Sequence, residues 1–211
     1  TPGIHGVIAD LIKVEKAYET AIETALGGSI QNIVTDTEET AKRMIQYLKQ
    51  NKFGRATFLP LTSMHGSGGI RDAQALKEPG VIGLANTLVT VEAKFQVLAD
   101  QLLGRTIVVD HIDHGIAIAR KYRQSLRLVT LEGDLINPGG SMTGGAFKNS
   151  SNLLSRRREI EEFEETVALL KKDMSAMEQE VSAIKEKRAA CYSANDEIQQ
   201  KLGNASITEN T

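Results

Sequence analysis

The sequence has little cysteine and few aromatic side chains. Its single cysteine, Cys191, excludes an internal disulfide framework and fits a reducing compartment. It has no tryptophan and only 4% aromatic residues, which argues against a platform for stacking single-stranded bases. No apolar run approaches the ~18 residues that span a membrane, and the N-terminus lacks the basic and apolar segments of a secretory signal. We therefore expect a globular, cytoplasmic protein.

The sequence also lacks an excess of positive or negative charge. The chain of 211 residues carries 25 Lys and Arg against 27 Asp and Glu, a formal net charge of -2. This balance excludes a strongly basic nucleic-acid binder but leaves room for a local basic patch. Apolar residues make up 41% of the chain, an ordinary value for a globular protein. The length predicts one or two domains.

Glycine and proline are almost absent from the last third of the chain. Seventeen of the 18 glycines and all four prolines precede residue 150, and 156–202 contains neither. Thirteen positions in steps of three and four follow one stripe, and eleven are apolar: Ile160, Phe163, Val167, Leu170, Met174, Met177, Val181, Ile184, Arg188, Cys191, Asn195, Ile198 and Leu202. Such a narrow heptad stripe predicts a coiled-coil helix over 151–202. Gly203 then predicts a helix end and a disordered tail over 203–211.

The first 150 residues contain an internal repeat. Val14-Glu15-Lys16-Ala17-Tyr18 is followed 77 positions later by Val91-Glu92-Ala93-Lys94-Phe95, and Ile33-Val34-Thr35-Asp36 is matched by Ile107-Val108-Val109-Asp110. Each copy continues with a helical pattern and a second apolar run, so each reads helix, strand, helix, strand. We predict two similar subdomains over 1–62 and 81–150. A glycine-rich stretch opens the linker between them, which we place at 63–80.

A second glycine-rich segment stands out over 139–145. Gly139-Gly140 and Gly144-Gly145 flank Ser141-Met142-Thr143, which suit a short extended strand. A nucleotide-binding site would need backbone amides at a helix N-terminus and usually a Lys, and neither is evident, since Lys148 is the only nearby base. Glycine beside a strand often marks the close approach of another backbone. The residues alone therefore leave two interpretations open, a contact between two chains and a plain hairpin turn.

The remaining reactive residues do not form a recognisable catalytic site. Asp110-His111-Ile112-Asp113-His114 offers metal-ligand types, but acids and histidines after a strand are also common where a helix begins. Cys191 falls on the heptad stripe, where burial as a small apolar group is the expected role. We expect no enzyme activity, no cofactor and no metal.

Basic residues gather where the globular part meets the predicted coil. Arg156, Arg157 and Arg158 are consecutive, with Lys148 shortly before them. Guanidinium groups there could bind nucleic-acid phosphates, but five glutamates follow within seven residues and could pair with them. A further basic face could involve Lys42, Arg43, Arg120, Lys121 and Arg123.

Several motifs together resemble the hinge domain of structural maintenance of chromosomes (SMC) proteins of bacterial type. The motif with the greatest specificity is Gly-Asp-Leu-Ile-Asn-Pro-Gly-Gly-Ser-Met-Thr-Gly-Gly at 133–145. Supporting motifs are Gly-Ile-His-Gly-Val-Ile-Ala-Asp-Leu-Ile at 3–12, Ala-Leu-Gly-Gly at 25–28, Gln-Asn-Ile-Val at 31–34 and Gly-Arg-Ala-Thr-Phe-Leu-Pro-Leu at 54–61. The resemblance covers nearly all of the globular part.

The resemblance implies an α+β fold of two similar mixed βα subdomains followed by one long coiled-coil helix. It also implies homodimerisation, with the interface at Gly139, Gly140, Ser141, Met142, Thr143, Gly144 and Gly145. In this family the hinge joins two coiled-coil arms of an ATPase that entraps DNA in chromosome condensation and segregation. A nucleoid-associated location follows from the resemblance.

Two further expectations come with the family. The first is a role for Lys148 and Arg156 to Arg158 in DNA binding, which rests on location only; the alternative function is a DNA-binding module with dimerisation secondary. The second is that the sequence is a fragment, because the antiparallel helix that would complete the coiled coil, and the ATPase head, are not in it.

Overall fold

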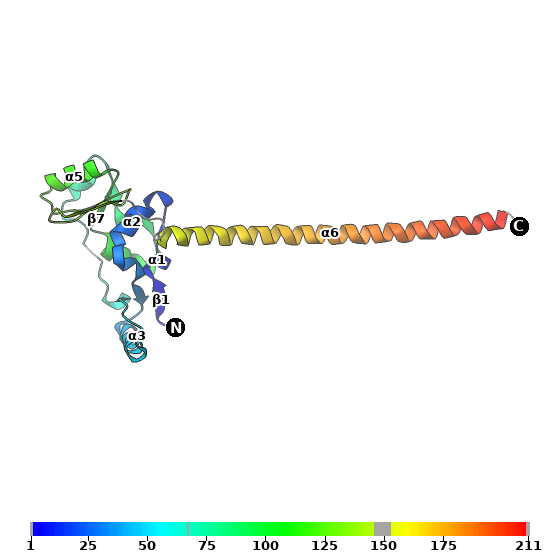
Figure 1. Cartoon of the computed structure of the whole chain (residues 1–211), viewed down its shortest axis with the longest axis horizontal. Coiled ribbons are helices and arrows are strands. Elements are labelled where there is room, and N and C mark those ends of the chain that lie inside the picture. The colour runs from blue at the N-terminus through cyan, green and yellow to red at the C-terminus, as the bar shows by residue number, and fades with distance from the viewer. Residues whose placement is uncertain (1, 67, 146–152, 210–211) are drawn as a thin grey trace. The chain divides into compact units, whose positions relative to one another are not determined.

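The computed structural model describes residues 2–66, 68–145 and 153–209 (Figure 1). Contacts between residues divide the chain into two units, residues 1–159 and residues 160–211. Among the described residues, no helix is long and apolar enough to cross a membrane.

The first repeat contributes a small three-stranded sheet. Its elements are β1 (Ile4–Val7), α1 (Ile8–Leu11), β2 (Lys13–Val14), α2 (Glu19–Leu26), β3 (Ile33–Thr35), α3 (Glu38–Asn51) and β4 (Phe58–Pro60). The strand order is β1-β3-β4, with β1 antiparallel to β3 and β4 parallel to it. Helix α3 is the crossover that a parallel pair requires.

The second repeat follows the same plan in a larger sheet. Its elements are β5 (Val81–Leu84), β6 (Val89–Thr90), α4 (Gln96–Leu103), β7 (Thr106–Val109), α5 (Ile112–Lys121), β8 (Arg127–Thr130), β9 (Leu135–Ile136) and β10 (Met142–Thr143). The strand order is β10-β9-β8-β7-β5, with β7 and β8 parallel and their neighbours antiparallel. The helix–strand–helix–strand order predicted for both copies, and the predicted fold class, are confirmed.

The two repeats are joined by a two-stranded ladder. Strand β2 pairs antiparallel with β6, and Lys13 lies opposite Thr90. The separation of these two residues, 90 − 13 = 77, equals the repeat offset. Equivalent segments of the two copies therefore pair with each other, as expected around an approximate two-fold axis. In Figure 1, α3 and α5 lie at opposite ends of this unit, with α2 between them.

One apolar core is shared by both repeats. It contains Ile22 of α2 and Val34 of β3 from the first copy, and Leu98 of α4, Val108 of β7 and Val129 of β8 from the second. A second cluster packs α5 on the other face of the large sheet, where Ile107 and Leu128 point. Adjacent residues of β7 thus face different clusters, as the alternation of side chains along a strand requires.

The predicted linker over 63–80 is partly built into the second cluster, which packs α5 on the large sheet. A short 3₁₀ helix, Ala73–Lys77, places Ala75 in the α5 cluster with no exposed surface. The glycine-rich start of the segment gave no signal for this packing, because a single small apolar residue has no periodicity. The subdomain boundaries assigned from the sequence stay a prediction.

The last helix, α6, runs from Leu153 to Glu209. In residues 160–202 the predicted stripe is exposed along its length, with Phe163 68% and Met177 66% accessible, and Cys191 is exposed as well. The helix continues past Gly203, so the helix end predicted there differs from the structure. Glycine inside a helix costs only about 1 kcal/mol relative to alanine, and no proline follows to prevent continuation.

The shared core predicts that the two repeats unfold together. Leu98→Ala should remove about 2–5 kcal/mol of the free energy of unfolding, because Leu98 is 2% exposed and its truncation leaves a cavity. Urea unfolding of residues 1–159, followed by circular dichroism, should show one transition at a lower midpoint. Two separated transitions, one per repeat, would contradict a common core.

Candidate functional site

The glycine-rich segment forms a hairpin at one end of the large sheet. Strand β10 pairs with β9, with Met142 opposite Ile136 and Thr143 opposite Leu135. The strand predicted at Ser141-Met142-Thr143 is thus present as residues 142–143. All residues from Gly139 to Gly145 are exposed.

Glycine is required at the four positions for different local reasons. Gly139 and Gly140 occupy the turn with φ of +89° and +90°, a region that residues with a side chain rarely adopt. A Cβ on Gly144 would collide with the carboxylate of Asp134. One on Gly145 would meet nothing within 4 Å, but Gly145 has a φ of +138°, which residues with a side chain also rarely adopt. The hairpin-turn interpretation therefore accounts for the first pair, and contact within the subunit accounts for Gly144.

The outer side of β10 is an unpaired strand edge in the described part of the chain, where β10 is the last strand of its sheet. The backbone N–H of Asn137 donates to the carbonyl of Ser141 at 2.9 Å, so Ser141 is directed toward β9. Hydrogen-bonding direction alternates along a strand. The N–H and C=O of Met142 consequently point away from β9, and its side chain is 52% exposed.

A second edge with an apolar groove lies in the small sheet. Strand β4 ends the order β1-β3-β4, and Pro60, which cannot donate a ladder hydrogen bond, suits such a position. Beside it α3 and β4 enclose a hollow of about 490 Å³. Ala41, Ile45 and Phe58 supply much of its apolar lining, and Ile45 is 39% exposed.

The start of α6 is anchored in the core of the first unit. Leu154 is 4% exposed and belongs to the shared core. The backbone N–H of Leu154 donates to the Glu23 carboxylate at 3.5 Å, so a side chain of α2 serves one of the unpaired donors at the helix start. Burial, together with the nearby Glu19 carboxylate, raises the pKa of Glu23 above its usual value, although the backbone donors of Leu153 and Leu154 oppose the shift.

The three consecutive arginines have different surroundings. Nε of Arg158 donates to Glu19 Oε1 at 2.6 Å, and the Glu19 side chain is only 5% exposed. Arg158 therefore neutralises a buried carboxylate, which leaves it less available to a DNA phosphate. Arg156 and Arg157 are exposed. Lys148, the fourth residue assigned to DNA, lies outside the described residues.

The wider basic face is not assembled. Lys42 and Arg43 belong to α3, whereas Arg120 and Lys121 belong to α5 at the opposite end of the unit (Figure 1). Nζ of Lys121 also forms an ion pair with Glu78 at 2.7 Å. These residues do not form one continuous surface.

The histidine cluster follows the helix-start interpretation. Asp110 lies just before α5, where its Oδ1 accepts from the His111 backbone N–H at 2.6 Å and contacts His114 Nδ1 at 2.7 Å. These contacts lower the pKa of Asp110. No group of three or more His, Cys, Asp or Glu within residues 2–66, 68–145 and 153–209 is placed to hold a metal.

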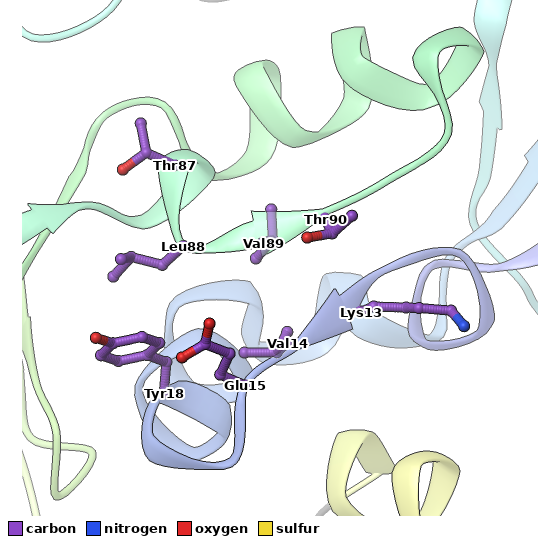
Figure 2. A pocket seen from close by; sticks show the side chains of 8 residues that line it. All are labelled: Lys13, Val14, Glu15, Tyr18, Thr87, Leu88, Val89 and Thr90. Atoms are coloured by element: carbon purple, nitrogen blue, oxygen red, sulfur yellow. The ribbon is translucent and has the colours of Figure 1, made fainter. Parts of the chain in front are cut away.

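A hollow of about 430 Å³ lies beside the β2–β6 ladder (Figure 2). Eight residues of the described chain line it: Lys13, Val14, Glu15, Tyr18, Thr87, Leu88, Val89 and Thr90. Lys13 points away at one end, while Glu15 and Tyr18 lie together at the other, near Leu88 (Figure 2). This lining has no nucleophile paired with a base, so the hollow offers no catalytic arrangement.

Sequence reasoning missed Glu19 and Glu23. Both occur in an ordinary amphipathic helix, and nothing in their spacing indicates burial. They become recognisable only once α6 packs against α2, because their partners are 139 and 131 residues away.

Removing the charge of Glu23 should stabilise the first unit at neutral pH. A carboxyl whose pKa is raised on folding favours the folded state below its ordinary pKa and loses that contribution as the pH rises through the folded value. Glu23→Gln keeps an acceptor for Leu154 without the buried charge. We expect a higher thermal unfolding midpoint than wild type at pH 7, with a difference that shrinks near pH 4.

The matched control for this change is Glu132→Gln, which removes an exposed carboxylate in a turn. It should leave the midpoint almost unchanged at both pH values. A Glu23→Gln protein that is less stable than wild type at pH 7 would show that the charge is needed at the helix start.

Comparison with known proteins agrees with this arrangement. The family model described as the SMC proteins flexible hinge domain matches residues 1–119. The chromosome partition protein Smc of Bacillus subtilis is 44% identical over 186 residues, which is 87% of this chain and 16% of that protein. The Smc protein of Methanocaldococcus jannaschii is 43% identical over 72% of this chain and 13% of its own length. The chain therefore spans about a sixth or less of these two relatives.

Solved structures give the same result. An asymmetric dimer of the Geobacillus stearothermophilus SMC hinge domain matches with a TM-score of 0.73 at 39% identity, over 89% of this chain and 76% of that one. The Pyrococcus furiosus Smc hinge domain with an extended coiled coil matches with a TM-score of 0.58 at 30% identity, over 96% and 70% of the two chains. Through its two βα repeats, its glycine-rich hairpin and the helix that leaves its core, this chain belongs to the SMC hinge domain family.

Proposed function

We propose that this chain is a homodimerisation module in which the edge strand β10 of one copy pairs with the edge strand β4 of a second copy. The observation that carries the proposal is the outward direction of the Met142 N–H and C=O on a terminal strand. Unpaired strand edges are templates for another strand. The Geobacillus stearothermophilus relative is described as a dimer, which supports the same role here.

The groove beside β4 favours this edge as the partner of β10. The exposed Met142 side chain can enter the apolar hollow around Ile45 and Phe58, whereas pairing of β10 with itself would leave that hollow unfilled. Under two-fold symmetry the β10–β4 contact occurs twice, once from each copy. The glycines on either side of Met142 keep the edge free of bulky side chains.

In a full-length protein we expect the hinge dimer to join two coiled-coil arms. The apolar stripe of α6, exposed from Ile160 to Leu202, supports pairing with an antiparallel helix. We further infer that the joined arms contribute to DNA entrapment in chromosome condensation and segregation, at the nucleoid. This part of the proposal rests on family membership, because the chain spans only a small fraction of its relatives.

A proline at position 142 tests the dimer contact. Met142→Pro removes the outward N–H but no hydrogen bond to β9, so each subunit should stay folded. Two donors are lost per dimer, and the proline ring obstructs the edge, so we expect dimer affinity to fall by about tenfold or more. Light scattering over a concentration series should show the shift toward monomer.

The control is Met142→Val, which keeps the backbone N–H and has a side chain that favours a strand. It should retain most of the dimer, and both variants should give native circular dichroism. Gly144→Glu is a poorer test, because its side chain would collide with Asp134 within the subunit. If Met142→Pro dimerises as strongly as Met142→Val, β10 is not the interface edge.

DNA binding at the root of α6 is a second candidate function, favoured by the exposure of Arg156 and Arg157. Replacing both by Glu should weaken DNA binding and lower the slope of log affinity against log salt by about two, since each phosphate contact contributes about 0.9. The matched control, Lys171→Glu with Lys172→Glu, also reverses two positive charges but lies further along the helix. Equal losses in both pairs would indicate a general charge effect.

A further inference from the structure

The parallel strands β7 and β8 begin beside a hollow of about 540 Å³ that plays no part in the proposed dimer contact. The register places Thr106 opposite Arg127, so the residues just before the two strands lie at one edge of the sheet. Residues from four separate segments line the hollow: Gly69, Ile70, Arg71, Asp72, Arg105, Ser125, Leu126, Arg127 and Pro138.

Positive charge dominates this lining. It contains the guanidinium groups of Arg71, Arg105 and Arg127 against one carboxylate, that of Asp72. Within the described residues, none of these three arginines takes part in an ion pair at 4.0 Å or less. Three cations that line one hollow with a single carboxylate leave an excess of positive charge, and an anion in the hollow would relieve the resulting repulsion.

Arg127 gives the strongest indication that the hollow attracts an anion. It is half-buried at the start of β8, and its Nη1 donates to the Thr106 hydroxyl at 3.4 Å, a long hydrogen bond to a neutral group. Burial lowers the pKa of Arg127 below its usual value. A guanidinium that has lost part of its hydration gains most from a charge-assisted hydrogen bond. The geometry leaves such a bond available from the side of the hollow.

From this arrangement we propose that the hollow binds a phosphate-bearing ligand through Arg71, Arg105 and Arg127. Guanidinium groups bind phosphate oxygens in a bidentate way, and three of them match its multiple charge. Small-molecule sites have volumes of about 300–1,000 Å³, so the space exceeds the need of a bare phosphate. The apolar lining residues Ile70, Leu126 and Pro138 suit the organic part of a phosphate ester.

The phosphate could come from a small molecule or from a nucleic-acid strand, and three probes distinguish these sources. Inorganic pyrophosphate, thymidine monophosphate and a short oligothymidylate are each titrated into the dimeric protein by calorimetry, with thermal unfolding as a second readout. Ligands that bind the folded state raise the unfolding midpoint. Tightest binding by the oligonucleotide indicates a strand, and tightest binding by the small phosphates indicates a small molecule.

The main variant is Arg71→Glu with Arg105→Glu, two exposed residues whose replacement leaves the cores intact. We expect it to weaken binding of the preferred probe by about tenfold or more per arginine, because each loses a charge-assisted hydrogen bond. Arg120→Glu is the matched control, since it reverses an exposed arginine on α5 outside the hollow. It should bind almost as the wild type does.

Two results would overturn the proposal. One is the absence of binding and of any thermal shift with all three probes. The other is an equal loss of probe binding in Arg120→Glu, which would show that binding depends on net charge alone. The mass of every variant in solution is measured alongside, and it should remain that of the wild type. Failure of this site is thereby distinguishable from failure of the β10–β4 dimer.

Discussion

Burial of the two repeats against each other is the interaction on which the rest of the structure depends. Each repeat has a sheet too small to bury an adequate core alone, and stability requires that its apolar face find a partner. Ile22 and Val34 from one copy meet Leu98 and Val108 from the other in a single cluster. Because this contact covers one face of the large sheet and α5 covers the other, the parts of that sheet left open to a second molecule are its strand edges and strand ends.

The root of α6 extends the same core by a different kind of contact. Leu154 inserts as an apolar residue, but Glu19 and Glu23 bring two carboxylates into its neighbourhood. Burying a charge is unfavourable unless it is paired and hydrogen-bonded. Arg158 meets that requirement for Glu19, whereas Glu23 accepts the backbone N–H of Leu154 at 3.5 Å and has a raised pKa. The first turn of the helix is thus fixed by complementary polar groups, which confer orientation more than stability.

The glycine-rich hairpin shows how one motif serves two requirements. Gly139 and Gly140 are needed by the turn, and Gly144 is needed because Asp134 occupies the space of a side chain. These demands belong to the single subunit and are compatible with the proposed role in dimerisation. The edge that they leave open at Met142 is the surface that a second copy could use. The proposed contact is therefore made by Met142 and not by the glycines on either side of it.

The local pattern of this sequence determined much of its architecture. Two β-rich runs followed by helical periodicity, repeated at an offset of 77, were sufficient to predict α3, α5 and the strands β3, β4, β7 and β8, because those signals depend on neighbouring residues. The uninterrupted stretch after residue 156 likewise determined α6. The short strands β2, β6 and β9 could not be predicted, since two residues carry no periodicity. Strand β10 is equally short and was predicted only because pairs of glycines flank it.

Tertiary structure alone decided which side chains meet. The pairing of Glu19 with Arg158, the groove between Ile45 and Phe58, and the convergence of Arg71, Arg105 and Arg127 join residues that are 13 to 139 positions apart in the sequence. Such contacts depend on how helices and strands pack, and packing is set by the whole core. The sequence by itself therefore determined the elements and their order, while the folded core decided which charges are buried, which edge is open and where an anion could bind.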